Sequence, residues 1–146
     1  MKETFEGQCQ CGNIKYQVVG VAATVFACHC TECQRQSGSA FGMALWVKEP
    51  EVKIISGQLQ EWVREMPSSR LMSCSFCSVC GTRVFHKVAE QNDVLSIKPG
   101  TLNNCKNLVV EAHIWTGSKH EWLKIEDGAP QFNKNPDSFS DLMKAR

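Results

Sequence analysis

The sequence has no long apolar run and no excess of charge. Its longest apolar stretch, residues 18–27, is interrupted by Gly20 and Thr24, and it is shorter than the ~20 residues that a bilayer-spanning helix needs. Sixteen Lys and Arg residues against 15 Asp and Glu residues give a net charge of +1. A nearly neutral chain has no general attraction for nucleic acid or for an anionic membrane. We therefore expect no nucleic-acid partner and no membrane association.

The sequence also has no apolar signal-peptide core, internal repeat, low-complexity tract or linker. Residues 1–6 are mostly polar or charged, so we expect a cytoplasmic protein with reduced thiols. A length of 146 residues suits one domain, which we expect to span residues 1–146. Residues 131–146 include Asn133, Asn135 and Pro136, and we expect them to form a loosely attached tail.

Strand signals outnumber helix signals along the chain. Alternating or β-branched runs, separated by glycines, predict strands at residues 13–19, 41–47, 52–56, 60–63, 83–88, 94–98 and 108–115. Short helical turns are expected at residues 31–37 and 137–144. This pattern predicts a mainly β fold, either a sandwich or an open barrel, with few short helical turns.

Nine cysteines in a reduced compartment need a separate explanation. An odd number without a secretion signal argues against a disulfide framework. Eight of the nine fall into three short groups, in which neighbouring cysteines are two or three residues apart. Such spacing suits several sulfur ligands of one metal ion.

The first constellation joins a C-x-C pair to a C-x-x-C pair. Its members are Cys9, Cys11, Cys77 and Cys80. Gly81 follows the second pair, where it lets a tight turn close. Four thiolates form a closed tetrahedral site, so we expect a structural zinc here. The competing interpretation is four buried thiols that act as small apolar side chains.

The second constellation consists of three cysteines within six residues: Cys28, Cys30 and Cys33. Three protein ligands with an open position are typical of a reactive zinc. His29 alternates to the other side of the strand, so we interpret it as a hydrogen-bonded residue and not as a ligand. Cys74 has three interpretations: the missing fourth ligand, an occasional member of the first site, or an inert core thiol. We favour an inert or accessory role for Cys74, and we interpret Cys105 as a small buried residue.

An open three-thiolate zinc has a definite chemistry. It carries net negative charge and is a poor Lewis acid, but it can capture an incoming thiol, which loses its proton on binding. A small thiol and an aldehyde are therefore natural reactants. The alternative is a second structural zinc, completed by Cys74.

Three motifs resemble one family closely, the glutathione-dependent formaldehyde-activating enzyme (GFA) family, which includes centromere protein V. They are residues 7–12, 28–39 and 76–82, and the resemblance extends from about Gly7 to Pro136. Weaker matches are residues 98–102 and residues 113–115 with Lys119 and Trp122. A last group is Asp127 and Gly128, ahead of Pro130 and Phe132. One departure is that Asn103 and Asn104 stand where many members carry an acidic residue.

The resemblance implies a fold, two zinc ions per chain and an activity. The implied fold is a zinc-pinned β-sandwich of coiled antiparallel sheets. Cys9, Cys11, Cys77 and Cys80 would hold a structural zinc, whereas Cys28, Cys30 and Cys33 would hold a second zinc at the catalytic site. The implied activity is that of a carbon–sulfur lyase that forms S-hydroxymethylglutathione from glutathione and formaldehyde. A non-catalytic zinc-stabilised binding module and a glutathione or aldehyde carrier are the alternatives.

Glutathione has two carboxylates, and Arg35 is the best-placed cation for one of them because it follows Cys33 by two residues. Glu32 is expected to be solvated, and residues 37–39 either form a plain turn or offer backbone donors. Other cations and aromatic walls that could contact the substrate are Arg70, Arg83, Lys98, Lys119, Trp46, Trp62 and Trp115.

Overall fold

The structure is a computed structural model that describes residues 3–90 and 93–142. The chain forms two compact units. The first comprises Met1–Ala22 and Trp46–Asn107, and the second comprises Ala23–Leu45 and Leu108–Arg146. Each unit is therefore built from two separate stretches of sequence. The single-domain organisation expected for residues 1–146 stays a prediction.

A three-stranded antiparallel sheet opens the first unit, in the order β1 (Glu3–Gln8), β2 (Lys15–Gly20) and β5 (Val52–Ser56). Tyr16 and Val18 alternate onto the buried face of β2, as the two-residue period of a strand requires. Gly7 of β1 pairs with Tyr16, and a Cβ atom at Gly7 would lie 2.3 Å from the Tyr16 ring. This close approach of strand to ring therefore requires glycine.

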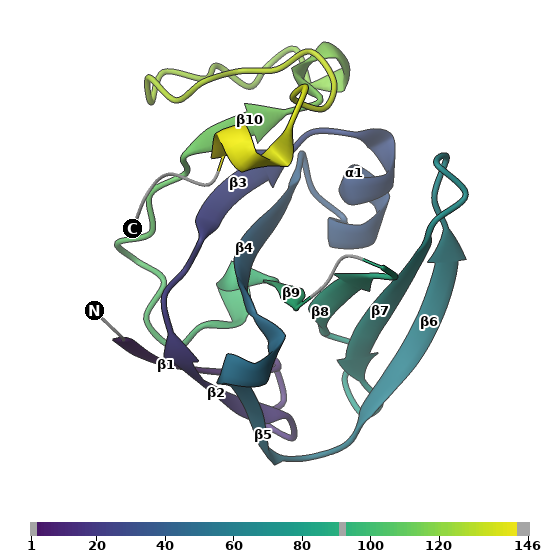
Figure 1. Cartoon of the computed structure of the whole chain (residues 1–146), viewed down its shortest axis with the longest axis vertical. Coiled ribbons are helices and arrows are strands. Elements are labelled where there is room, and N and C mark those ends of the chain that lie inside the picture. The colour runs from purple at the N-terminus through teal and green to yellow at the C-terminus, as the bar shows by residue number, and fades with distance from the viewer. Residues whose placement is uncertain (1–2, 91–92, 143–146) are drawn as a thin grey trace. The chain divides into compact units, whose positions relative to one another are not determined.

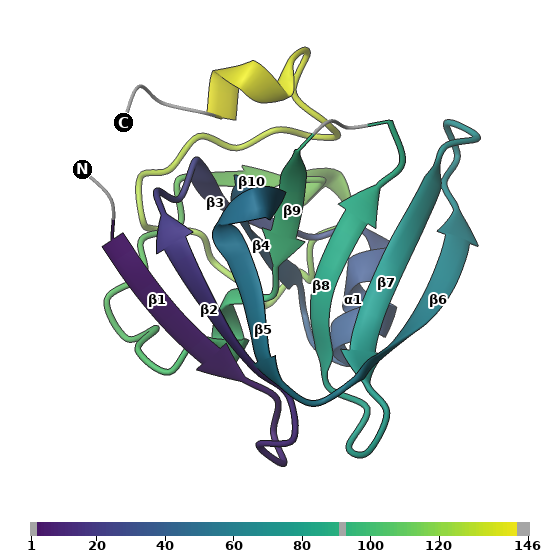
Figure 2. The same ribbon diagram turned by 60° about the horizontal axis from the view of Figure 1, so that its bottom comes forward.

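An antiparallel meander forms the rest of the sheet structure in the first unit (Figure 2). Its strands are β6 (Leu59–Glu65), β7 (Leu71–Cys77), β8 (Arg83–Val88) and β9 (Val94–Ile97). Short 3-10 turns precede β5 and follow β9, at Glu49–Glu51 (η1) and Pro99–Thr101 (η2). Tyr16 of β2 meets Phe85 of β8 edge to face, with ring centroids 5.0 Å apart. The two sheets of this unit thus pack as a sandwich around buried aromatic and aliphatic side chains.

In the second unit, β3 (Thr24–Cys28) lies between β10 (Ala112–Ile114) and β4 (Gly42–Lys48) (Figure 1). The chain passes from the second unit into the first within β4. β10 runs parallel to β3. Every residue of β3 is buried, as expected of a central strand that is covered on both faces.

The helix α1 (Thr31–Ser37) follows β3 directly. The Sγ atom of Cys30 caps its first turn by accepting a hydrogen bond from the backbone N–H of Cys33. Glu32 in the first turn and Arg35 in the last turn complement the helix dipole. Two 3-10 turns, Thr116–Ser118 (η3) and Phe139–Leu142 (η4), complete the helical structure of this unit in the described residues. No helix in the described residues is long and apolar enough to cross a bilayer.

The described part of the predicted tail, residues 131–142, makes several contacts. Phe132 donates its backbone N–H to His113 of β10, and the indole N–H of Trp115 donates to Asn135 Oδ1. Leu142 is buried, and the ring of Phe139 lies 6.2 Å from that of Phe26. Loose attachment concerns motion in solution and stays a prediction, and residues 143–146 lie outside the described residues.

The predicted mainly β class is confirmed. The predicted strands at residues 13–19, 41–47, 52–56, 60–63, 83–88 and 94–98 match observed strands, whereas β1, β3 and β7 were not predicted. The long strand expected at residues 108–115 is wrong, since only Ala112–Ile114 is a strand. The helical turn expected at residues 31–37 is confirmed as α1. Of the turn expected at residues 137–144, only η4 is present, and residues 143 and 144 are not described.

Candidate metal centres and their surroundings

The first candidate centre gathers four cysteines of the first unit: Cys9, Cys11, Cys77 and Cys80. Their Sγ atoms all lie within 4.8 Å of one another. Cys11 Sγ is 3.6 Å from Cys9 Sγ and 3.8 Å from Cys77 Sγ. Four sulfurs placed ~2.3 Å from one zinc ion would be about 3.8 Å apart in a tetrahedron. The sulfur positions therefore fit a closed four-thiolate site.

Two tight turns bring these cysteines together. Cys9 and Cys11 lie in the connection between β1 and β2, whereas Cys77 ends β7 ahead of the turn into β8. That turn closes through a hydrogen bond from Gly81 N–H to Cys77 C=O, and Gly81 has a φ of 80°, which favours glycine. Cys77 Sγ also accepts hydrogen bonds from the N–H groups of Val79 and Cys80. Such N–H donors stabilise a thiolate.

The pKa values in this group favour mixed protonation in the absence of a cation. The Thr82 hydroxyl and other donors lower the pKa of Cys80 to about 5, and the N–H of Cys80 lowers that of Cys77. For Cys11, the N–H of Asn13 acts to lower the pKa, but desolvation and the neighbouring cysteines raise it to about 12. A bound divalent ion would make all four cysteines thiolates, because metal binding displaces thiol protons.

The second candidate centre gathers Cys28, Cys30 and Cys33, whose Sγ atoms also lie within 4.8 Å of one another. Cys28 ends β3, Cys30 caps α1, and Cys33 lies in the helix. No fourth His, Cys, Asp or Glu from the described part of this unit joins the group. Cys28 is buried, whereas Cys30 and Cys33 are half-buried, so the group has a solvent-facing side.

The three sulfurs of the second group share protons unequally. Hydrogen bonds from Cys28 and Cys33 lower the pKa of Cys30 to about 2, and the hydrogen bond to Cys30 raises that of Cys28. Gly42 of β4 packs closely against this group, because a Cβ atom there would lie 3.1 Å from Cys33 Cβ. The Cys30 thiolate is thus stabilised while ionisation of Cys28 becomes harder. A bound cation would allow both to be thiolates.

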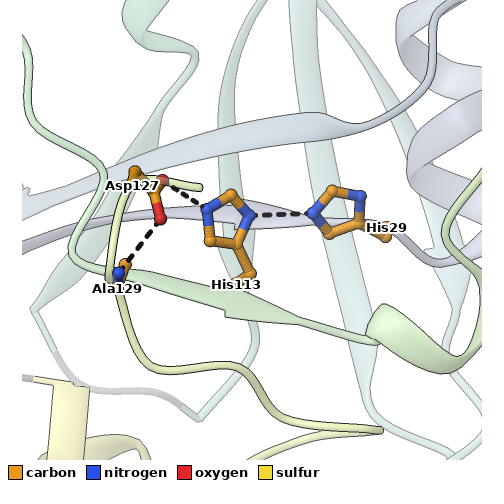
Figure 3. Close-up of polar contacts among 4 residues, drawn as sticks. All are labelled: His29, His113, Asp127 and Ala129. Atoms are coloured by element: carbon orange, nitrogen blue, oxygen red, sulfur yellow. Dashed lines mark hydrogen bonds and ion pairs between the residues drawn. The ribbon is translucent and has the colours of Figure 1, made fainter. Parts of the chain in front are cut away.

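A chain of hydrogen bonds runs from the buried His29, between Cys28 and Cys30 in the sequence, to the exposed Asp127 (Figure 3). His29 is fully buried between the two cysteines that flank it, and its Nε2 lies 2.9 Å from Nδ1 of His113. His113 Nε2 lies 2.7 Å from Oδ2 of Asp127, whose Oδ1 accepts a hydrogen bond from the N–H of Ala129. The hydrogen bond from His113 lowers the pKa of Asp127, so its carboxyl group is ionised at neutral pH.

This geometry fixes the ring protons when both histidines are neutral. The Asp127 carboxylate accepts from His113 Nε2, so His113 Nδ1 accepts from His29 Nε2. His29 Nδ1 then carries no proton, and in the structure this buried atom has no hydrogen-bond partner. Desolvation, followed by the influence of His113, lowers the pKa of His29 to about 4. His29 is thus hydrogen-bonded and is absent from the second cysteine group, in agreement with its interpretation as a non-ligand.

A hollow of about 600 Å³ lies beside α1. It is lined by α1, by the loop that follows it at residues 38–40, and by His120 and Trp122. The Trp122 indole N–H donates to His120 Nδ1, and His120 Nε2 lies 3.2 Å from Gln34 Oε1. Gln34 Nε2 in turn donates to the carbonyl of His29. The wall of the hollow is therefore connected to the peptide that joins two of the clustered cysteines.

The cations and tryptophans proposed from the sequence are divided between the two units. Arg35 lines the hollow, and Lys119 of the same unit donates to the carbonyl of Leu123. Arg83 of the first unit lies 5.8 Å from the Trp62 ring centroid and contacts His86. The remaining residues are Arg70, an exposed residue of the first unit; Lys98, also of the first unit; Trp46, which is buried; and Trp115, which is bonded to Asn135.

Two cysteines lie outside both groups in the described residues. Cys74 is fully buried and pairs across β7 and β8 with His86, and desolvation raises its thiol pKa. It is not a member of the first group, in agreement with an inert role. Cys105 is half-buried, so its interpretation as a buried residue is wrong.

The sequence did not predict the hydrogen bonds of the two buried histidines, His29 and His113, or the hollow beside α1. His113, Trp122 and Asp127 were matched to a family motif, but no contact was predicted for them. The contacts of Gln34 with Ser118 and His120 could not be predicted from the sequence, because these partners are 84 and 86 residues away along the chain.

Comparisons with known proteins agree with the sequence motifs. The sequence profile of the family described as glutathione-dependent formaldehyde-activating enzyme matches residues 4–118. No curated protein is significantly similar to this chain. A crystal structure of a Rhodobacter sphaeroides protein is similar, with 18% sequence identity and a TM-score of 0.56, covering 70% of this chain and 91% of that chain. At this identity the likeness concerns the fold alone.

Proposed function

Because the chain belongs to the glutathione-dependent formaldehyde-activating enzyme family, we propose that it is a zinc-dependent enzyme of the carbon–sulfur lyase type. The proposed reaction forms S-hydroxymethylglutathione from glutathione and formaldehyde, or joins a related thiol and electrophile. The reactants would be a small thiol and an aldehyde, and the proposed cofactor is zinc, with two ions per chain.

The observation that supports this proposal most is the difference between the two cysteine groups. Cys28, Cys30 and Cys33 form a group of three with a solvent-facing side, whereas the other group has four sulfurs. A four-thiolate site is closed and suits a structural role, but a three-thiolate site leaves a position for a ligand from solution. We assign the structural zinc to Cys9, Cys11, Cys77 and Cys80, and the reactive zinc to Cys28, Cys30 and Cys33.

Zinc held by the second group would supply a binding position for a thiol and favour loss of its proton. The described residues define the surroundings of that position. Cys30 fixes the start of α1 against the group, and Gly42 leaves room for Cys33. His29, His113 and Asp127 are hydrogen-bonded in series behind it, which holds the connection between Cys28 and Cys30 in one conformation.

The proposed reaction balances without a further reactant. The thiol sulfur forms a bond to the aldehyde carbon while the carbon–oxygen π bond breaks, and the proton lost by the thiol ends on the new hydroxyl. Arg35 is proposed to bind a substrate carboxylate. Its side chain is 82% exposed, and its Nη1 lies 3.9 Å from Glu32 Oε1, a contact weak enough for a ligand carboxylate to replace.

Exchange spectroscopy by NMR tests the enzyme proposal directly. The exchange rate between free formaldehyde and S-hydroxymethylglutathione would be measured with and without the zinc-loaded protein. We expect faster exchange with wild-type protein and with Cys105→Ser, but no acceleration with Cys30→Ser. If wild-type protein leaves the exchange rate at its buffer value, the enzyme proposal fails and the binding-module or carrier alternatives gain support.

A further inference from the structure

We propose that one face of the meander from β6 to β9 binds a phosphate dianion, either free or as the terminal group of a small phosphorylated molecule. We call the residues that would form this site the cationic face: Trp62, Arg64, Arg83, His86 and Lys98. The cationic face belongs to the first unit, whereas the second cysteine group belongs to the second. Phosphate binding there therefore does not depend on the proposed enzyme function.

Strand pairing places these side chains on one face of the meander, which can be followed in Figure 2. Residues directly opposite each other in an antiparallel pair project on the same face. One row of opposite residues crosses all four strands and consists of Trp62, Cys74, His86 and Ser96. Arg64 lies two residues beyond Trp62 on β6, so it shares this face. Lys98 follows Ser96 by two residues in an extended conformation, and its N–H donates to the carbonyl of Val84 on β8.

Arg83 lies on the same face and is held in place from two sides. It pairs with Phe76, which is two residues from Cys74 on β7. Its Nη1 donates to Nε2 of His86 over 2.8 Å, and its guanidinium carbon lies 5.8 Å from the centroid of the Trp62 ring. Neither contact neutralises the positive charge, and the bond to His86 uses one of five N–H donors. The guanidinium is thus preorganised for an anion.

The strand residues on this face carry positive charge without a carboxylate among them. The two acidic residues of β6, Glu61 and Glu65, alternate onto the other face, and β7, β8 and β9 contain no Asp or Glu. Lys98, Arg83 and Arg64 all act with desolvation to lower the pKa of His86, so the three cations converge on that ring. Like charges gathered around a partly desolvated group repel one another, and a bound anion offsets this repulsion.

The donors of the cationic face suit a phosphate dianion better than a carboxylate. Arg64 comes from β6, Arg83 from β8 and Lys98 from the segment after β9, so a ligand can be bound from more than one side. A phosphate group carries up to two negative charges and has three strongly accepting oxygens, whereas a carboxylate has one charge and a planar pair. His86 accepts at Nε2, so the neutral ring carries its proton on Nδ1 and adds a donor.

The cationic face is partly open to solvent. Trp62 is 51% exposed, and Arg64, Arg83, His86 and Lys98 are half-buried. Half-buried charges are reachable by a small ion, and they interact with it more strongly than fully solvated charges do. A small phosphate ligand therefore fits this face in both access and charge.

Isothermal titration calorimetry with inorganic phosphate tests the proposal on the full-length protein with its metal ions bound. Ionic strength is held constant, because salt screens charge contacts. We expect saturable binding by wild type, with affinity about tenfold lower in Arg83→Gln and about fivefold lower in Arg64→Gln and in Lys98→Gln. Thermal unfolding in chloride buffer would verify that each variant is folded.

Two cations of the first unit that lie off the cationic face serve as matched controls. Arg70, in the turn between β6 and β7, and Lys53, on β5, are both exposed. Arg70→Gln and Lys53→Gln remove the same charges as the test variants, and both should bind phosphate as wild type does. Equal loss of affinity in controls and test variants would show a general charge effect and overturn the site.

The ring nitrogen signals of His86 locate the bound ion. They would be assigned by comparison with His86→Gln and followed by NMR during a phosphate titration. We expect them to shift with the midpoint that calorimetry gives, because His86 contacts the Arg83 guanidinium. Phosphate binding that leaves these signals unchanged would place the ion elsewhere and contradict the proposal.

Methyl phosphate and acetate identify the ligand chemistry. Tighter binding of methyl phosphate than of inorganic phosphate would support a site for a phosphorylated molecule, and the reverse order would support a site for the free ion. Acetate, a monoanion, should bind about tenfold more weakly than phosphate. Equal binding of acetate, no saturable binding of phosphate, or displacement of phosphate by S-methylglutathione would each overturn the proposal. The last result would assign these cations to the thiol substrate and leave the enzyme proposal standing.

Discussion

The Cys30 side chain has two roles, as the cap of α1 and as a candidate metal ligand, and a substitution can separate them. Its sulfur caps α1 by accepting the N–H of Cys33, and the same sulfur belongs to the second cysteine group. Serine is a good helix N-cap, but its hydroxyl is a poor substitute for a thiolate ligand. Substitution by serine should therefore spare the helix and lose the metal.

We predict that Cys30→Ser binds one zinc ion per chain where wild type binds two. Thermal unfolding should shift by only a few degrees, because the cap and the first cysteine group remain. Elemental analysis of the purified proteins and circular dichroism would measure both effects. Cys105→Ser is the control and should keep two ions; retention of two ions by Cys30→Ser would contradict the assignment of the second site.

His86 predicts a pH dependence of stability that is independent of the cysteine groups. Desolvation, with help from Lys98 and Arg83, lowers its pKa from 6.5 to about 2. Between these values the unfolded chain binds a proton that the folded chain does not, so stability falls as the pH drops below about 6.5. At pH 5.5 this difference amounts to at most about 1.4 kcal/mol.

The variant His86→Gln isolates that contribution. Glutamine keeps an acceptor for the Arg83 guanidinium but cannot titrate. Urea unfolding at pH 7.5 and pH 5.5 should show a smaller loss of stability in the variant than in wild type. Metal loss at low pH affects both proteins alike, so equal losses in the two would show that His86 does not titrate as argued.

The sequence predicted the cysteine groups because metal ligands have a recognisable spacing. It did not predict the hydrogen-bonded series of His29, His113 and Asp127, since a single histidine or aspartate has no spacing signature. Alternation along the strand excluded His29 as a ligand, but it could not name the partner that β10 brings to it. The roles assigned to the individual cysteines stay predictions until metal content is measured.

At the scale of secondary-structure elements, predictions were best for strands whose runs of β-forming residues have clear ends. β8 was predicted with its observed bounds because its run of β-forming residues ends cleanly before and after. β3 was missed because all of its residues are buried, so it lacks any alternation. β7 contains two serines and two cysteines, so its sequence has a weak preference for a strand. Its strand conformation depends on pairing with β6 on one side and β8 on the other.

The contact between β1 and β2 yields a steric prediction. A Cβ atom at Gly7 would lie 2.3 Å from the ring of Tyr16 and 2.7 Å from the backbone carbonyl of Thr101. Tyr16 is fully buried and cannot move aside easily. We predict that Gly7→Ala destabilises the protein by about 2 kcal/mol, in the range of overpacked cores.

Gly100→Ala provides the matched comparison for Gly7→Ala. A Cβ atom at Gly100 meets nothing within 4 Å, so this variant should unfold within about 0.5 kcal/mol of wild type. Urea unfolding monitored by tryptophan fluorescence would give both values. If the two variants had equal stability, the close approach of β1 to the Tyr16 ring would not exist in solution.

At the scale of the whole molecule, the first cysteine group ties together distant parts of one unit. Cys9 and Cys11 follow β1, and Cys77 and Cys80 lie between β7 and β8. Free energies of zinc binding to structural sites, about 10–16 kcal/mol, exceed or equal the stability of most domains. The second group, by contrast, joins residues of one short segment and has fewer ligands.

We therefore predict that a chelator removes the two ions in distinct stages. The ion bound by three cysteines should leave first with little change in the circular dichroism spectrum. The ion bound by four should leave later, together with loss of β structure. A colorimetric zinc-release assay run alongside circular dichroism would follow both stages; simultaneous loss, or loss of both without unfolding, would contradict the assignment of roles.

The pairing of β10 with β3 affects the order in which parts of the fold can form during synthesis on the ribosome. Cys28, Cys30 and Cys33 leave the exit tunnel early, yet the strand beside Cys28 includes Ile114 and is made much later. The first cysteine group, in contrast, has all its members once residue 80 has emerged. A nascent chain would thus complete its four-cysteine group while the three-cysteine group still lacked its neighbouring strand, so we expect the second group to reach its final surroundings only after residue 114 has emerged.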